Sequence, residues 1–103
     1  MNFVFDNHEV KVTDESGKIL VRATFPVIKE GVVNINHTYV DPSLRGQGIA
    51  SILMTKVCDF LVEKNIKWVA TCPYAVVWLK KHPEYNSMID IETQTTLAPE
   101  CQI

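Results

Sequence analysis

The stretch Val40-Asp41-Pro42-Ser43-Leu44-Arg45-Gly46-Gln47-Gly48-Ile49-Ala50 decides the fold of this chain. An apolar, β-branched run precedes it, and a long amphipathic pattern follows it. A strand that passes through a glycine turn into the first turn of a helix presents free backbone N–H groups, which bind anions. The two glycines let a ligand oxygen approach the main chain, and Arg45 adds a positive charge. We therefore interpret the stretch as a phosphate-binding loop.

Two common phosphate-binding motifs do not fit this loop. The Walker motif requires Gly-Lys-Ser/Thr at the helix start, whereas Gly48 is followed by Ile49, and the dinucleotide fingerprint requires a third glycine where Ser51 stands. The pattern Arg-x-x-Gly-x-Ala does fit, and it resembles the acetyl-CoA pyrophosphate loop of the GNAT N-acetyltransferase superfamily. A turn that merely caps a helix is the alternative, but a cap needs neither the arginine nor both glycines.

Hydrophobic patterns on both sides of the loop predict the remaining elements. The expected strands are residues 3–14 (broken near Asn7-His8), 18–27, 32–40 and 67–72, and the expected helices are residues 46–64 and 75–81. In the third strand, Val33, Ile35, His37 and Tyr39 share the face that we expect to meet the core. Residues 86–103 are interpreted as either a last strand or a loose tail.

The order of these elements resembles a compact GNAT domain over residues 8–85. The resemblance is closest to a subgroup of very small members, with His-Thr-x-Val before the loop and Cys-x-Tyr/Phe at the end of the next strand. Here these motifs read His37-Thr38-Tyr39-Val40 and Cys72-Pro73-Tyr74. The resemblance implies an α/β (α+β) fold in a single domain over residues 1–103, with two main helices packed on a mixed, mostly antiparallel sheet. The helix pair that helps to form the acceptor site in larger members is missing.

The resemblance also implies where acetyl-CoA would bind. Its pyrophosphate would meet the N–H groups of about Gly46 to Ala50, where the helix dipole adds about 0.3–1 kcal/mol. Its pantetheine arm would lie between the strand before the loop and the strand after the helix, and a backbone N–H near Val40 would donate to the developing oxyanion. The predicted cofactor-binding residues are Tyr39, Val40, Arg45, Gly46, Gln47, Gly48, Ile49, Ala50 and Tyr74.

The acceptor amine must be neutral to attack, and a lysine with a pKa of about 10.4 is almost fully protonated near pH 7. His37 is either a general base or substrate-pocket residue, or a core-face histidine bonded to the backbone. Cys72 is either an acyl-carrying nucleophile, an acid–base thiol in direct transfer, or a small buried residue. We predict His37 and Cys72 as catalytic residues. Tyr74 is either a proton donor to the leaving thiolate or a packing residue, and Tyr85, for which the same two roles are open, is interpreted as packing against Trp78 and Pro83.

Composition narrows the class of protein and its partners. The 103 residues are 47% hydrophobic and 21% charged, which is typical of one globular domain. The net charge of −2 argues against a nucleic-acid groove, and no apolar run approaches the ~20 residues that cross a membrane. The N-terminus does not resemble a signal peptide. The odd, widely spaced cysteines Cys58, Cys72 and Cys101 predict neither a disulfide framework nor a zinc site.

These observations lead to three hypotheses. We expect a cytoplasmic, metal-free N-acyltransferase that moves an acetyl group from acetyl-CoA to a small amine or peptide amine, directly or through Cys72. The second hypothesis is a CoA-binding sensor or interaction domain without activity. The third is a structural domain that binds no CoA.

Overall fold

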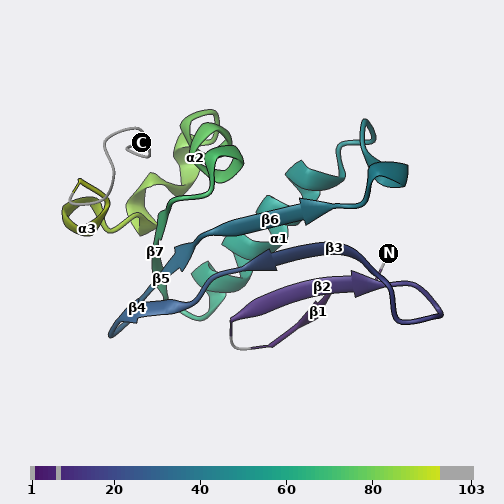
Figure 1. Ribbon diagram of the computed structural model, residues 1–103. Coiled ribbons are helices and arrows are strands. Elements are labelled where there is room, and N and C mark those ends of the chain that lie inside the picture. Colours follow the sequence, from purple (N-terminus) through teal and green to yellow (C-terminus); the bar gives the residue numbers. More distant parts are fainter. Residues whose placement is uncertain (1, 7, 96–103) are drawn as a thin grey trace.

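The computed structural model describes residues 2–6 and 8–95 as a sheet layer with helices packed against it (Figure 1). The strands are β1 (Val4–Phe5), β2 (Glu9–Thr13), β3 (Ile19–Thr24), β4 (Val27–Lys29), β5 (Val32–Ile35), β6 (His37–Val40) and β7 (Lys67–Ala70). The α-helices are α1 (Ile49–Glu63), α2 (Pro73–Lys80) and α3 (Ile91–Thr95), and two 3-10 helices cover Pro42–Leu44 and Pro83–Met88.

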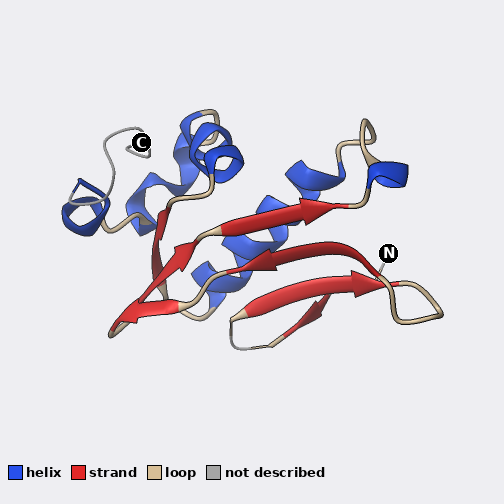
Figure 2. Ribbon diagram, viewed as in Figure 1, coloured by secondary structure: helices blue, strands red, loops and turns tan. Residues whose placement is uncertain are grey.

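The strands form two sheets, with the orders β1-β2-β3-β6 and β4-β5-β7. Each pair of neighbouring strands is antiparallel except β5 and β7, which run parallel. The chain between these two strands contains β6 and the helix α1. Figure 2 shows α1 lying across the strands and α2 following β7. The predicted mixed, mostly antiparallel sheet with two main helices is confirmed.

The predicted third strand is divided at Asn36, and the division reverses its side-chain alternation. The Asn36 N–H donates to the Thr24 carbonyl, and β6 then continues in the other sheet, with Thr38 opposite Ala23 and Val40 opposite Val21. Val21 and Ala23 are fully buried, so Thr38 and Val40 share the core face. An inserted residue moves the following side chains to the opposite face of a strand. The prediction that His37 and Tyr39 lie on the core face is therefore wrong, and His37 is exposed.

Helix α1 buries one apolar stripe against the sheet, as its periodicity predicts. Its fully buried side chains are Leu53, Met54, Val57, Cys58 and Leu61. The helix begins at Ile49, three residues later than expected, because Gly46 and Gly48 adopt the left-handed conformation with φ of 84° and 74°. Helix α2 begins two residues earlier than expected, at Pro73, because proline fits the first turn of a helix.

The segment after α2 covers the outer edge of β7 without adding a strand in the part that the structure describes. Ile89 forms one bridge to Trp68, and the Asp90 N–H donates to the Trp68 carbonyl. The buried Gln94 side chain accepts from the Ala70 N–H at 2.7 Å and donates to the Ala70 carbonyl at 3.0 Å. A side-chain amide thus replaces a neighbouring strand at the end of β7. The rest of the expected strand or tail, residues 96–103, lies outside the described residues.

The sequence predicts neither a membrane-spanning segment nor a disulfide framework. In the described ranges, none of the helices has both the length and the apolar character needed to cross a bilayer. Cys58 and Cys72 are free and buried, and Cys101 lies outside the described residues.

Candidate functional site

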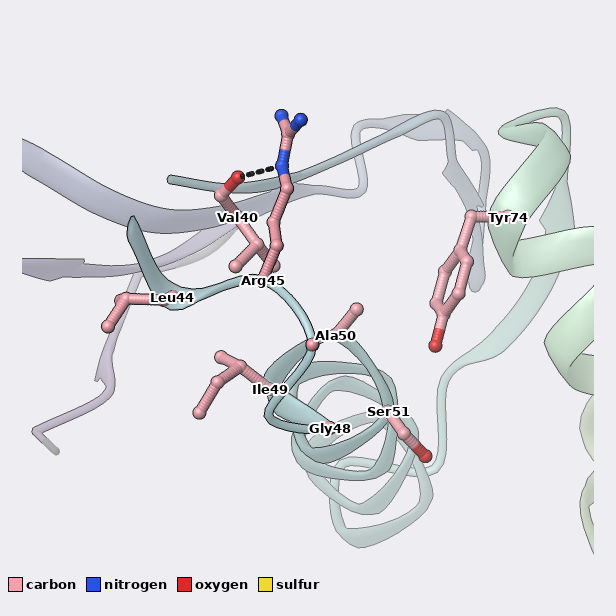
Figure 3. Close-up of a pocket in the computed structure, with 9 residues that line it drawn as sticks. Val40, Leu44, Arg45, Gly48, Ile49, Ala50, Ser51 and Tyr74 are labelled. Atoms are coloured by element: carbon pink, nitrogen blue, oxygen red, sulfur yellow. Dashed lines mark hydrogen bonds between the residues drawn. The ribbon is translucent and has the colours of Figure 1, made fainter. Parts of the chain in front are cut away.

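Two adjoining pockets lie between β6, the start of α1 and the start of α2. The first, of about 150 Å³, is lined by Val40, Leu44, Arg45, Gly46, Gly48, Ile49, Ala50, Ser51 and Tyr74 (Figure 3). The second, of about 380 Å³, is lined by Thr38, Tyr39, Val40, Arg45, Ala50 and Tyr74. Four residues line both pockets, so the two form one cleft. Of the predicted cofactor-binding residues, Gln47 is the one that lines neither pocket.

The backbone amides of residues 46–51, most of which line this cleft, have no hydrogen-bond acceptor among the described residues. The helix ladder begins with the Ile52 N–H, which donates to the Gly48 carbonyl, whereas the last amide paired before it is that of Arg45, which donates to the Pro42 carbonyl. Gly48 is the N-cap residue and has no side chain to satisfy them. Unpaired amides at the positive end of a 15-residue helix form a site for an anion.

A buried carboxylate anchors the turn that leads into the loop. Asp41 accepts from the Ser43 N–H at 3.0 Å and the Ser43 hydroxyl at 2.5 Å, and lies 3.3 Å from Lys18 Nζ. The Ser43 hydroxyl and amide, followed by Lys18, lower the pKa of Asp41 to about 2. The Tyr39 hydroxyl also reaches Asp41, at 3.4 Å. The start of the loop is therefore held by charge-assisted hydrogen bonds.

Arg45 and Val40 define the β6 side of the cleft. Arg45 Nε donates to the Val40 carbonyl at 3.0 Å (Figure 3), and no carboxylate of the described residues pairs with its guanidinium. The Asp41 N–H donates to the Leu20 carbonyl, so the alternation of an antiparallel ladder turns the backbone N–H and carbonyl of Val40 away from β3. The Val40 N–H is thus presented to the open side of β6.

Cys72 lies two residues beyond the last paired residue of β7, and its side chain has a polar contact with Thr38 of β6. The Cys72 Sγ and Thr38 Oγ1 atoms are 3.4 Å apart, and Cys72 is 7% exposed as the N-cap residue of α2. His37 projects from the opposite face of β6, so the structure does not bring the two predicted catalytic side chains together. Thr38 was missed because period-two alternation without the break at Asn36 assigns it to the outer face.

Tyr74 and Tyr85 have different surroundings. Tyr74 descends from α2 into the cleft on the side opposite Arg45 (Figure 3), and burial raises the pKa of its hydroxyl. Tyr85 donates to Asp59 Oδ1 at 2.7 Å and stacks on Trp78, with ring centroids 5.7 Å apart. Burial and the Asp59 carboxylate raise the pKa of Tyr85. Of these two tyrosines, Tyr74 is therefore the one that faces the cleft.

Ser51 is a second residue that sequence reasoning missed. Its Oγ accepts from the Trp78 indole N–H at 2.9 Å, and no described residue accepts a hydrogen bond from its hydroxyl. It lines the first pocket beside the unpaired amides. Its position directly after Ala50, in the first turn of the helix that follows the loop, could have indicated that it lines the site.

The chain is similar to proteins of a known family. The family model of the GCN5-related N-acetyltransferases matches residues 8–88. The chain belongs to this family. The NATD1 proteins of Gallus gallus and Homo sapiens are each 34% identical to it over 59 residues, or 57% of this chain. The chain spans about half the length of these curated relatives, 54% and 52% respectively.

Solved structures share the fold of this chain. A GCN5-like protein from Staphylococcus aureus superposes with a TM-score of 0.71 at 26% identity, covering 85% of this chain and 86% of that one. Rv2747 from Mycobacterium tuberculosis, solved in complex with CoA and NLQ, superposes with a TM-score of 0.58 at 14% identity over 91% of this chain and 70% of that one. The predicted compact GNAT fold is therefore confirmed.

Proposed function

We propose that this protein transfers the acetyl group of acetyl-CoA to a primary amine. The observation that carries the proposal is the row of unpaired amides at residues 46–51, which opens into a cleft bordered by Arg45 and Tyr74. A helix cap or structural turn needs no such cleft beside its unpaired amides. Membership of the GCN5-related N-acetyltransferase family supports the reaction class.

The residues of the cleft fit the chemical parts of CoA. The amides of residues 46–51 and the guanidinium of Arg45 suit a diphosphate. The edge of β6 at Val40, which no neighbouring strand covers in the part of the chain that the structure describes, borders the space that a pantetheine arm would cross. Acetyl-CoA, when bound, supplies an activated thioester. The Val40 N–H then serves as donor to the oxyanion, an interaction worth about 3–4 kcal/mol in other enzymes.

The surroundings of Cys72 favour direct transfer. A nucleophilic thiol needs a base within hydrogen-bond reach, and the polar contact of Cys72 is the hydroxyl of Thr38. His37 is exposed on the other face of β6, so it serves as general base only for an amine that enters from that face. Tyr74 lines both pockets, and a phenol is protonated at neutral pH, so its hydroxyl is the proposed donor to the leaving thiolate.

The acceptor is proposed to be a small amine or peptide amine that enters over the sheet face carrying His37. A polar pocket of about 360 Å³ lies on this side of the sheet, and it is lined by Asp6, His8, Glu9, Arg22, Thr24, Pro26 and Asn36. Glu9 is ion-paired with Arg22 and Lys11. This face therefore offers hydrogen-bonding groups beside the proposed base.

Calorimetric titration with CoA and acetyl-CoA tests the proposal, with Arg45→Glu as the test variant and Lys67→Glu as the control. Both substitutions change the net charge equally, and Lys67 is an exposed residue outside the cleft. We expect Arg45→Glu to lose CoA binding while Lys67→Glu retains it. Ligand at 100 times its Kd should stabilise the wild type by about 2.7 kcal/mol, seen as a thermal shift. Equal affinities in all three proteins would refute the assigned site.

Turnover is measured separately as release of the CoA thiol with a panel of amines. Release that depends on the amine supports the transferase, whereas tight CoA binding without turnover of any amine supports a sensor. Intact-protein mass spectrometry after incubation with acetyl-CoA distinguishes the two routes of transfer. Direct transfer predicts no acetyl adduct on the wild type, and an adduct that Cys72→Ala abolishes would establish the acyl-enzyme route.

A further inference from the structure

We infer that the acceptor is a peptide, which lies extended on the outer face of the sheet layer with its backbone carbonyls bonded to the side-chain amides of Asn34 and Asn36. The inference rests on the proposed function and adds to it the class of acceptor. The outer face is the one turned away from α1. The two asparagines lie where β5 ends and β6 begins (Figure 1).

Strand alternation places both side chains on this outer face. The neighbours of Asn34 in β5 are buried in the core, so Asn34 points to the opposite face of the strand. Asn36 follows two residues later, and its side chain contacts Thr24, which stands opposite the exposed His37 in the β3–β6 ladder. The two amides therefore form one row beside His37, the proposed base.

Each amide of this row has its oxygen occupied by a threonine hydroxyl. Thr24 Oγ1 donates to Asn36 Oδ1 at 2.5 Å, and Thr71 Oγ1 donates to Asn34 Oδ1 at 3.2 Å. No described residue accepts a hydrogen bond from either Nδ2 group. A carboxamide carries one acceptor oxygen and two N–H donors. The row thus presents donors, and a ligand that binds it must supply acceptors.

An extended peptide supplies acceptors at the matching spacing. Alternate side chains on one face of a strand are about 7 Å apart, which is the expected separation of Asn34 and Asn36. The carbonyls of an extended peptide alternate in direction, so those on one side recur with the same period. The two amides pair carbonyls that contact with the sheet would otherwise leave without a partner. An aliphatic amine has no carbonyl and gains nothing from the row.

The polar pocket beside this row defines the rival acceptor. Asn36 also lines this pocket, which has a volume of about 360 Å³. Its Glu9 carboxylate is ion-paired with Arg22, whereas Asp6 has no ion pair within the described part of the chain. A single unpaired carboxylate holds one ammonium group, so a diamine is the alternative to a peptide.

Nitrogen–proton correlation spectra of the wild-type side-chain amides, recorded with saturating CoA, test the inference without turnover. The probes are alanyl-alanyl-alanine amide and the diamine putrescine. We expect the tripeptide to shift the side-chain resonances of Asn34 and Asn36, and putrescine to leave them in place. A tripeptide that shifts neither resonance, or a diamine that shifts both as strongly, would overturn the inference alone. Failure of CoA to bind in calorimetry would instead refute the proposed function.

Substitution by aspartate reverses the row and keeps its support. Asn34→Asp and Asn36→Asp retain an oxygen that accepts from threonine and replace the amide donor by a charged acceptor. Each should weaken tripeptide binding by about 2 to 12-fold, the worth of one hydrogen bond, and strengthen putrescine binding. The affinity for CoA should stay unchanged, because neither residue lines the cleft.

Asn86→Asp is the matched control, because it makes the same change at an exposed residue that lines neither the cleft nor the polar pocket. We expect it to bind both probes as the wild type does. Unchanged tripeptide affinity in both test variants, or an equal loss in the control, would contradict the assignment.

Discussion

A comparison of Gly48→Ala with Gly31→Ala tests whether Gly48 is needed for ligand binding or only for the turn. Gly48 has φ of 74°, and Gly31, in the β4–β5 turn, has φ of 75°. A Cβ added at either position meets no other atom within 4 Å. The two alanine variants should therefore carry the same backbone strain, and only Gly48 lines the proposed phosphate site.

The expected magnitudes follow from this match. A left-handed non-glycine residue costs about 1–2 kcal/mol, which is partly offset by about 0.4–1 kcal/mol of reduced entropy in the unfolded chain. Each variant should thus lose about 1 kcal/mol of stability, or about 4–8 °C in Tm. At Gly48 the new methyl group also occupies space beside the unpaired amides. Loss of one hydrogen bond to a phosphate is worth about 1.5–3 kcal/mol, or about 10 to 150-fold in Kd for CoA.

Thermal melts and calorimetric titration with CoA measure the two effects independently. We expect similar Tm values for Gly48→Ala and Gly31→Ala, with weakened CoA binding in Gly48→Ala alone. Wild-type affinity in Gly48→Ala would refute the phosphate site, because a methyl group would then be tolerated where a phosphate oxygen must approach. An equal loss of affinity in Gly31→Ala would assign the effect to the fold.

Three further predictions test individual contacts. Ser51→Ala and Trp78→Phe should each weaken CoA binding by about 2 to 12-fold in titration, because the indole N–H orients a hydroxyl that otherwise lacks an acceptor; unaltered affinity in both would exclude Ser51 from the site. The pKa of Asp41, lowered from 3.8 to about 2, means that its ionised form stabilises the folded state above about pH 4 and that this contribution disappears as the pH falls toward 2. Urea titrations across this pH range should show that the free energy of unfolding falls less with decreasing pH in Asp41→Asn than in the wild type. The same dependence on pH in both proteins would contradict the stabilising role of the Asp41 carboxylate. Gln94→Ala should lower the free energy of unfolding by about 1–3 kcal/mol in urea, because it leaves the buried N–H of Ala70 unpaired; a change below about 0.5 kcal/mol would mean that water replaces the amide.

Local patterns in the sequence were sufficient for the loop and its helix. The unpaired amides depend on the order of strand, glycines and amphipathic helix, which are neighbours along the chain. The same local information predicted the strand that ends near Cys72, and the apolar stripe of α1. Each of these features depends on backbone preference and on periodicity over a few turns.

Tertiary structure decided which side chains face the cleft. Asn36 moves β6 into the other sheet, so Thr38 rather than His37 meets Cys72. Strand periodicity cannot reveal this change, since it depends on pairing with β3, which lies far back along the chain. For the same reason, the Trp78 indole that meets Ser51 and the Gln94 amide that completes the edge of β7 follow no local pattern. The sequence by itself determined the glycine loop and the helix that follows it, and the packing of distant segments decided the shape of the cleft beside that loop.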